Sequence, residues 1–314
     1  MELLQTKPDQ RGLKYYFWLA ARGFAMGAAD VVPGVSGGTM AFILGIYEEL
    51  IHAIHAVNFT FISRMLTLRV REAFNEFPWQ FLLALGLGIA TAIFTLAEGL
   101  NWALHNHPVL VWAFFFGLVV ASVVVVHKRV SRWTPSAVLA LLLAAIGSFL
   151  LMGLVPTETP EAPWFLFLSG AMAIAAMVLP GISGAFILVL LGKYRYVLNA
   201  VVNRDIFTLL VVITGAAVGL VTFARLLRWM FRHYHDLTVA AMTGLMIGAL
   251  RKVWPWKQAA TAEIDGELQV VREINLLPEA FTPEVVLAIL LALLGFGFVV
   301  LLEHLAYRRS PASG

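Results

Sequence analysis

Two short segments of the chain place proline, glycine and serine at the same spacing. They are Pro33-Gly34-Val35-Ser36-Gly37-Gly38 and Pro180-Gly181-Ile182-Ser183-Gly184-Ala185. Proline interrupts a helix, and the helix that starts after the interruption offers unpaired backbone N–H groups and the positive end of its dipole to an anion. The serine hydroxyls add donors, and the glycines let a phosphate approach the backbone. The two segments therefore predict a shared pocket for an anionic head group, with close helix packing as the alternative reason for the glycines.

The composition of the chain places these segments in a membrane. Of 314 residues, 60% are hydrophobic and 13% are charged, and the mean hydropathy is +0.84. Charged residues make up about 25% of soluble domains, so water-soluble enzyme folds are excluded. The chain has no cysteine, which excludes disulfides, thiolate metal sites and cysteine nucleophiles. The net charge of +3 is interpreted as basic cytoplasmic loops rather than as a nucleic-acid surface.

The apolar stretches of the chain divide into single crossings and pairs. Six stretches are read as single crossings: 79–104, 109–126, 137–155, 206–231, 237–250 and 285–305. Four more form two pairs, 15–31 with 39–57 and 164–179 with 185–202, each joined by one of the uncharged segments. A helix over 15–31 rises about 25 Å, past the middle of a hydrocarbon core of about 30 Å. The pairs are therefore predicted to be re-entrant or broken helical hairpins, with a tight turn at the far interface as the alternative.

The two segments also belong to a longer internal repeat. Aligning Pro180 with Pro33 pairs 44–47 with 191–194 without a gap. Further along, one constant offset matches a glycine, a tryptophan and a second glycine in each half, namely Gly88, Trp102 and Gly117 with Gly215, Trp229 and Gly244. The sequence predicts two repeats, 10–156 and 157–309, within one integrated transmembrane domain.

Counting crossings predicts the relative orientation of the repeats. Each repeat holds one hairpin and three single spans, so its number of crossings is odd and the second repeat is inverted relative to the first. With both termini in the cytoplasm, the inner segments hold 15 of the 22 Lys and Arg residues, as membrane proteins favour. The predicted fold is therefore an all-α polytopic membrane protein with two inverted-topology repeats, the architecture of many transporters.

Several charged side chains within the apolar stretches are candidates for function. Asp30 precedes the first break by three residues, where a bare carboxylate is costly. It is expected to be neutral, to pair with a base such as Arg22, to bind a coupling H⁺ or Na⁺, or to cap freed N–H groups. Glu98 aligns with Arg225 in the repeat, and both are candidate coupling or gating residues. Glu48 with His52 and His55 shares a helix face, but no metal site is expected because a single helix supplies the cluster.

The first segment carries a resemblance to a known family. The stretch Gly27-Ala28-Ala29-Asp30-Val31-Val32-Pro33-Gly34-Val35-Ser36-Gly37-Gly38-Thr39, followed by Leu44-Gly45-Ile46-Tyr47-Glu48, resembles the signature of the bacterial polyprenyl-phosphate transporter family. Leu179-Pro180-Gly181-Ile182-Ser183-Gly184 resembles its second motif, and the resemblance covers essentially the whole chain. It implies a flippase of the bacterial inner membrane that returns undecaprenyl phosphate from the outer to the inner leaflet, recycling the carrier lipid of cell-wall synthesis without a cofactor.

The resemblance also implies which residues bind the phosphate. The expected ligands are Pro33, Gly34, Ser36, Gly37, Gly38 and Thr39 of the first repeat and Pro180, Gly181, Ser183 and Gly184 of the second. The motif residues Tyr47, Glu48 and Tyr194 are expected to act in gating, together with Asp30. The second repeat departs from the first, with Ala185 and Phe186 in place of Gly38 and Thr39, so the site is expected to be asymmetric.

Two other functions compete with the flippase. Membrane polyprenyl-pyrophosphate phosphatases also have inverted repeats and a Pro-Gly-x-Ser motif, but theirs continues with an arginine that clamps the phosphate. Gly37 and Gly184 stand there in this chain, which leaves Ser36 without a clamp or an adjacent base. An ion or small-anion channel or exchanger could use the same helix ends. The expected partners are the lipid substrate and membrane lipids, not nucleic acid, and the oligomeric state is open, a homodimer included.

Overall fold

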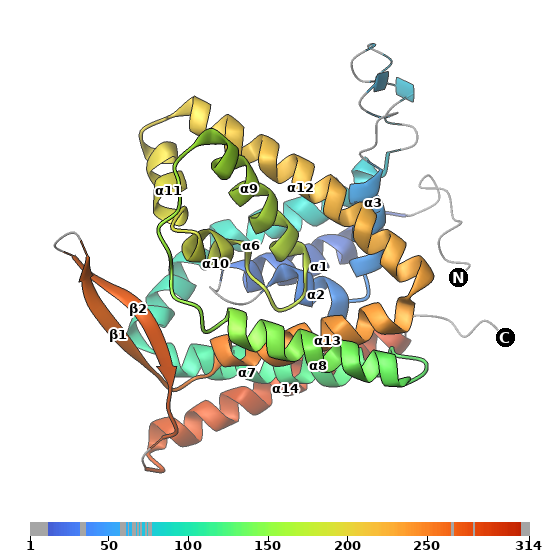
Figure 1. Ribbon diagram of the computed structural model, residues 1–314. Helices are drawn as coiled ribbons and strands as arrows, with labels where there is room; N and C mark the ends of the chain where they lie inside the picture. The colour runs from blue at the N-terminus through green and yellow to red at the C-terminus, as the bar shows by residue number, and fades with distance from the viewer. Residues whose placement is uncertain are drawn as a thin grey trace.

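A computed structural model of the chain describes residues 12–31, 36–56, 77–264, 267–278 and 280–308, with isolated positions between 61 and 74. In these parts the chain is almost entirely helical (Figure 1). The helices of the N-terminal half are α1 (Leu13–Asp30), α2 (Gly37–Ile43), α3 (Tyr47–His55), α6 (Trp79–Asn106), α7 (Pro108–His127) and α8 (Pro135–Leu151). The expectation of an all-α membrane fold is confirmed.

The C-terminal half follows the same order and adds one β-hairpin. Its helices are α9 (Pro163–Val178), α10 (Gly184–Leu190), α11 (Tyr194–Val202), α12 (Ile206–His233), α13 (His235–Val253) and α14 (Pro283–Arg308). The antiparallel strands β1 (Lys257–Ile264) and β2 (Glu267–Asn275) lie between α13 and α14. The corresponding connection between α7 and α8 spans only 128–134 and holds no strand. The β-hairpin therefore distinguishes the second half from the first (Figure 1).

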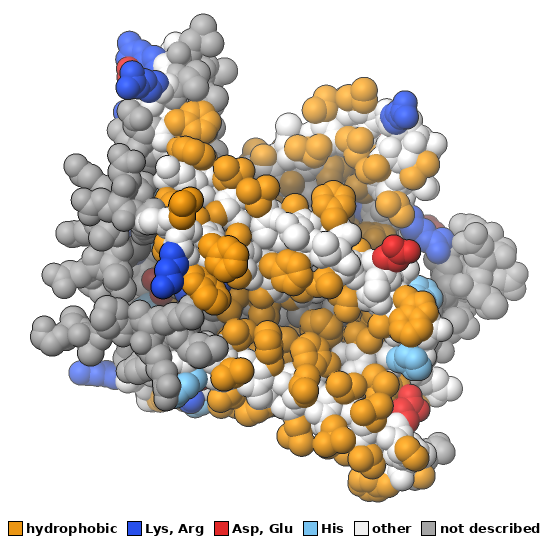
Figure 2. All heavy atoms as spheres, turned by 180° about the vertical axis from the view of Figure 1, so that it is seen from behind, with side chains coloured by type: hydrophobic (Ala, Val, Ile, Leu, Met, Phe, Trp, Pro, Cys, Tyr) orange, Lys and Arg blue, Asp and Glu red, His pale blue; other side chains and the backbone are white. Residues whose placement is uncertain are grey.

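Helices lie at the six expected single crossings, namely α6, α7, α8, α12, α13 and α14. Within the described parts, four of them (α6, α7, α12 and α14) are long and apolar enough to cross a membrane, and the bent pair α10 and α11 makes a fifth span if it is counted as one. The crossings at α8 and α13 stay predictions. Large apolar side chains point outward along α6, α8, α12 and α14, and Phe94 on α6 is 88% exposed. Figure 2 shows hydrophobic side chains spread across one face of the molecule. Because water would not tolerate such a surface, the chain is a multi-pass membrane protein.

The second arm of each hairpin was predicted as one apolar stretch, but in the structure it consists of two short helices. α2 ends at Ile43, and the chain turns through Gly45 (φ +70°) before α3 begins. α10 ends at Leu190, and the chain turns through Gly192 (φ +65°) before α11, which is bent by 105° from α10. In both turns the two residues after the C-cap donate their N–H groups back to the helix, as in a Schellman motif. Glycine takes the left-handed conformation that this motif requires, so the repeated Leu-Gly pair ends both short helices.

Four pairs of long helices pack lengthwise and surround the breaks. The pairs are α1 with α6, α9 with α12, α7 with α14, and α8 with α13. Glycines at the crossings let the backbones touch: a Cβ on Gly88 would lie 2.0 Å from the carbonyl oxygen of Ala20, and a Cβ on Gly215 would lie 2.0 Å from that of Phe167. Gly88 and Gly215 are matched in the sequence repeat, so equivalent residues make equivalent contacts. This agreement supports the repeat, whose bounds at 10–156 and 157–309 stay a prediction.

Candidate functional site

The two Pro-Gly-x-Ser-Gly segments lie against each other in the fold. The hydroxyl of Ser36 lies 3.2 Å from the carbonyl oxygen of Met177 and 3.3 Å from that of Leu179, both of which it can donate to. In the other direction, the backbone N–H of Gly181 donates to Oγ1 of Thr39 at 2.9 Å. These partners lie more than 140 residues apart in the sequence. The structure therefore brings the start of α2 and the end of α9 into direct contact.

The close approach of the two segments depends on a glycine and a buried tyrosine. A Cβ on Gly38 would lie 2.8 Å from the carbonyl oxygen of Val178 and 3.1 Å from that of Met177. The hydroxyl of Tyr47, on α3, donates to the same Val178 oxygen at 3.0 Å, and the Tyr47 side chain is fully buried. Tyr47 thus supports the contact between the breaks. Its position indicates a structural contribution to the site.

Asp30 caps the helix that follows the first break. Its Oδ1 accepts a hydrogen bond from the backbone N–H of Gly37 at 2.7 Å, and Oγ of Ser36 accepts from Gly38 N–H at 3.1 Å. A carboxylate therefore occupies the start of α2, where the sequence predicts an anion. Of the alternatives for Asp30, capping is the one that the geometry shows. Pro33 and Gly34 lie outside the described residues.

At the second break, the serine side chain does not cap the helix that follows. Ser183 precedes α10, and its side chain makes no capping hydrogen bond, in contrast to Ser36. Gly181 has φ +88°, a conformation that glycine tolerates, and the chain turns there directly after Pro180. A Cβ on Gly184 would lie 2.5 Å from the carbonyl oxygen of Ala173, so glycine is also needed for the packing of α10 on α9. The two breaks therefore differ: the Ser36 hydroxyl caps its helix, whereas the Ser183 hydroxyl does not.

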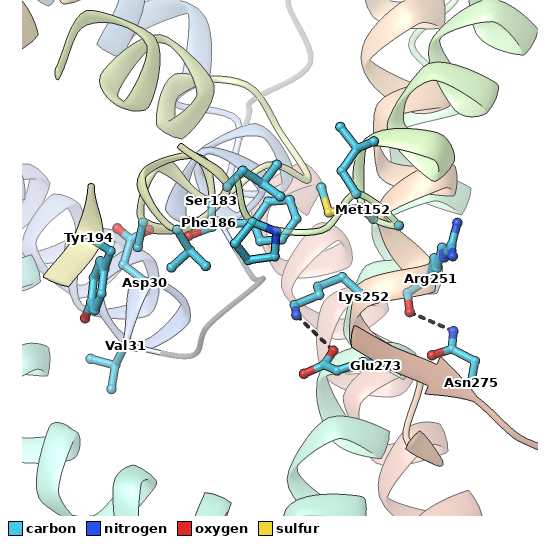
Figure 3. Close-up of a pocket in the computed structure, with 16 residues that line it drawn as sticks. Asp30, Val31, Met152, Ser183, Phe186, Tyr194, Arg251, Lys252, Glu273 and Asn275 are labelled. Carbon is cyan, nitrogen blue, oxygen red and sulfur yellow. Dashed lines mark hydrogen bonds and ion pairs between the residues drawn. The ribbon is translucent and has the colours of Figure 1, made fainter. Parts of the chain in front are cut away.

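A cavity of about 460 Å³ extends from the breaks to the β-hairpin (Figure 3). Asp30 and Ser183 line it at the breaks, and Tyr194 lines it from α11. Its opposite wall consists of polar residues from the end of α13 and from β2, namely Arg251, Lys252, Glu273 and Asn275. Figure 3 shows Asp30 and Tyr194 on one side, Lys252 and Glu273 in the middle, and Arg251 with Asn275 on the other side. The cavity thus extends from the start of α10 to the wall formed by Arg251, Lys252, Glu273 and Asn275, which we call the basic wall.

The basic wall is held in place by short polar contacts. The ammonium of Lys252 lies 2.9 Å from Oε2 of Glu273, and that of Lys257 lies 3.3 Å from the same oxygen. The Lys252 ammonium also lies 5.4 Å from the centre of the Phe186 ring, which faces it from α10. Burial lowers the pKa of Lys257 to about 8, with the Glu273 carboxylate opposing the shift. Two cations thus share one carboxylate beside the cavity.

The remaining predicted gating residues lie away from the cavity. Oε1 of Glu48 lies 3.8 Å from Nε2 of His235. Glu98 and Arg225 are exposed on α6 and α12. None of these three is among the described residues that line the cavity. In the described chain no group of three or more His, Asp or Glu side chains is placed to hold a metal.

The basic wall was not predicted from the sequence. Arg251 and Lys252 follow the stretch 237–250 directly, and Glu273 lies in the connection between that stretch and 285–305. One signal was available, because two adjacent basic residues stand at the end of an apolar stretch. Their pairing with Glu273 depends on a strand register that hydropathy does not reveal.

Comparison with known proteins identifies the family of the chain. Residues 26–270 match the family model described as "VCA0040-like: Undecaprenyl phosphate translocase-like". The chain is 41% identical over 262 residues to the polyprenyl-phosphate transporter of Vibrio cholerae serotype O1, covering 83% of this chain and 85% of that protein. It is 29% identical over 263 residues to the polyprenyl-phosphate transporter of Staphylococcus aureus, covering 77% of this chain and 88% of that protein. No solved structure matches.

These matches confirm the resemblance seen in the motifs. Both relatives are named transporters, which agrees with the prediction of a transporter rather than an enzyme. The family match spans both Pro-Gly-x-Ser-Gly segments and the two basic residues of the cavity wall, Arg251 and Lys252. On this evidence the chain belongs to the undecaprenyl phosphate translocase-like family of membrane transporters.

Proposed function

We propose that this protein is a flippase that moves undecaprenyl phosphate from the outer to the inner leaflet of the bacterial inner membrane. The transport of polyprenyl phosphate is supported by the names of its relatives. The direction and the undecaprenyl chain belong to the proposal. Such a transporter would recycle the carrier lipid of cell-wall synthesis.

The observation that carries the proposal is the cavity between the breaks and the basic wall. At one end of the cavity lies the Ser183 hydroxyl, which makes no capping hydrogen bond to α10, and on the opposite wall lies the Lys252 ammonium. Phosphate suits such a site because it accepts hydrogen bonds from hydroxyls and ammonium groups at once. A volume of about 460 Å³ suits a head group and the first part of the chain. The rest of the polyprenyl tail would stay in the bilayer.

The helix breaks fit re-entrant hairpins in two inverted repeats. α10 has seven residues and therefore rises about 10 Å before the chain bends by 105°. This length is about a third of a hydrocarbon core of about 30 Å, so the second arm does not cross at that angle. The contact between the breaks then lies within the membrane, where both repeats meet. Alternating exposure of this contact to the two leaflets would carry the head group across.

Asp30 is the proposed coupling residue, with H⁺ or Na⁺ as the ion. Its carboxylate holds the start of α2 while also lining the cavity. A phosphate that uses the Gly37 N–H must first replace this carboxylate, and neutralising Asp30 would ease the exchange. We also propose gating roles for five further residues: Glu48, Glu98, Arg225, Tyr47 and Tyr194. Both termini are proposed to lie in the cytoplasm.

Reconstituted vesicles test the proposed function. Full-length protein in vesicles should move a labelled polyprenyl phosphate between leaflets faster than protein-free vesicles do, because the cavity shields the head group from the hydrocarbon core. Loss of label accessibility from one leaflet measures the rate. Equal rates with and without protein would refute the flippase. Phosphate release from a polyprenyl pyrophosphate would instead support the membrane phosphatase, and ion flux without lipid would support the channel or exchanger.

A further inference from the structure

We propose that Lys252, Lys257 and Glu273 form the hairpin site, the part of this phosphate-binding cavity at which the head group of a prenyl phosphate replaces the Glu273 carboxylate. This site lies at the β-hairpin end of the cavity, apart from the helix breaks. The identity of the ligand rests on the proposed function. The position of the Glu273 carboxylate between two ammonium groups is a feature of the structure itself.

The geometry of Glu273 is that of an anion held between two cations. Its Oε2 lies 2.9 Å from the Lys252 ammonium and 3.3 Å from the Lys257 ammonium. Lys252 and Glu273 line the cavity, whereas Lys257 is not among its described lining residues. An incoming phosphate can therefore reach Lys252 and Glu273 from the cavity. Lys257 is a positioning residue that holds the carboxylate in place.

The charges at this position favour an anion with more than one negative charge. Two ammonium groups face one carboxylate, so among the described side chains of this cluster the positive charges exceed the negative charges by one. A phosphate monoester carries a charge of about −1.5 to −2 at pH 7 and has three strong acceptor oxygens. It can neutralise both ammonium groups, which a single carboxylate does not. Lys257 also packs its ammonium 3.9 Å from the Trp112 ring centre, which fixes its position independently of Glu273.

Glu273 belongs to the β-hairpin, which has no counterpart in the described connection between α7 and α8. Glu273 lies on β2, whereas Lys252 lies on α13. Asn275 of the same strand donates from Nδ2 to the carbonyl oxygen of Arg251 at 2.8 Å and ties the strand to the helix (Figure 3). The carboxylate can thus leave Lys252 through side-chain rotation while the hairpin stays attached. The same cavity then leads from Lys252 to Ser183 at the second break.

Two substitutions with opposite expected effects test the hairpin site. Farnesyl phosphate binding to the purified full-length protein in detergent should weaken about tenfold in Lys252→Gln, because one charge-assisted contact is lost. In Glu273→Gln binding should tighten about threefold, because the competing carboxylate is gone. A gain of affinity cannot result from misfolding. Weaker binding in Glu273→Gln, or unchanged binding in both variants, would overturn the proposal.

The matched control is another Lys–Glu pair remote from the cavity. Lys128 and Glu303 approach to 3.9 Å and carry the same two side-chain types. Lys128→Gln and Glu303→Gln should leave farnesyl phosphate binding unchanged. A change in these variants as large as that in Lys252→Gln would show a general charge effect and overturn the assignment.

Competing ligands identify which phosphate the hairpin site takes. Farnesol, which lacks the phosphate, should fail to displace farnesyl phosphate, and displacement at equal concentration would contradict the site. Inorganic phosphate should compete only at much higher concentration; equal potency would assign the site to free phosphate and overturn its assignment to a lipid head group. The vesicle assay separates this inference from the proposed function. Flipping with no effect of Lys252→Gln or Glu273→Gln on binding refutes the hairpin site alone, whereas binding without flipping refutes the flippase alone.

Discussion

Replacing Gly38 by alanine is expected to slow lipid transport strongly. The added Cβ would lie 2.8 Å from the Val178 carbonyl oxygen, and both atoms belong to the contact between the two breaks. Overpacking of this kind costs about 1–3 kcal/mol. Relief requires the start of α2 to move away from α9, which also separates Thr39 from Gly181 N–H. Because that contact positions the cavity wall at Asp30 and Ser183, we expect a transport rate reduced by more than about tenfold.

The measurement is the rate of lipid movement in vesicles that hold equal amounts of folded protein. Gly86→Ala, on α6, is the matched control, because its Cβ would meet no atom within 4 Å. This control should transport at the wild-type rate. Wild-type transport by Gly38→Ala would show that the two breaks need not touch, which contradicts the site described above.

Replacing each of the two motif serines by alanine is expected to change a different property, the free energy of unfolding in one case and the transport rate in the other. Ser36 is buried, caps α2 and lies within bonding distance of two carbonyl oxygens across the breaks. Ser36→Ala should therefore lower the free energy of unfolding by about 1–2 kcal/mol, since it loses a cap and buried hydrogen bonds. Ser183 has no capping bond and lines the cavity. Ser183→Ala should leave stability unchanged but slow transport about tenfold, because one hydrogen bond to a charged ligand is lost.

Thermal unfolding in detergent and lipid movement in vesicles give the two readouts. The substitution is identical at both positions, so each variant serves as the control for the other. An unchanged unfolding midpoint in Ser36→Ala would contradict its structural assignment. Wild-type transport by Ser183→Ala would remove this hydroxyl from the phosphate site.

The sequence predicted a helix at each of the six single crossings, four of which are long and apolar enough to span a membrane, and it predicted the sites of the helix breaks. Hydropathy was sufficient because an apolar run of about 20 residues has few alternatives to a spanning helix. The repeat matched Gly88 with Gly215, and the structure gives both the same close backbone contact. The sequence did not reveal that Gly45 and Gly192 end short helices, because an isolated glycine in an apolar stretch is compatible with a continuous helix.

Roles of individual side chains were harder to predict than their locations. Ser36 and Ser183 occupy equivalent positions in the motif, yet one hydroxyl is bonded within the protein and the other lies at the cavity. That difference depends on which carbonyl oxygens the other half presents, and a single motif does not encode it. The basic wall was missed for a related reason. Lys252 and Glu273 meet through tertiary contact between α13 and β2, 21 residues apart.

The most direct test of the central claim is an experimental structure of the protein with a polyprenyl phosphate bound. We predict phosphate density inside the cavity bounded by Asp30, Ser183 and Lys252, either near Ser183 or at the hairpin site. The lipid tail should leave the cavity toward the bilayer. Phosphate density outside this cavity, with the contact between Ser36 and the end of α9 unchanged, would show that the cavity is not the phosphate site.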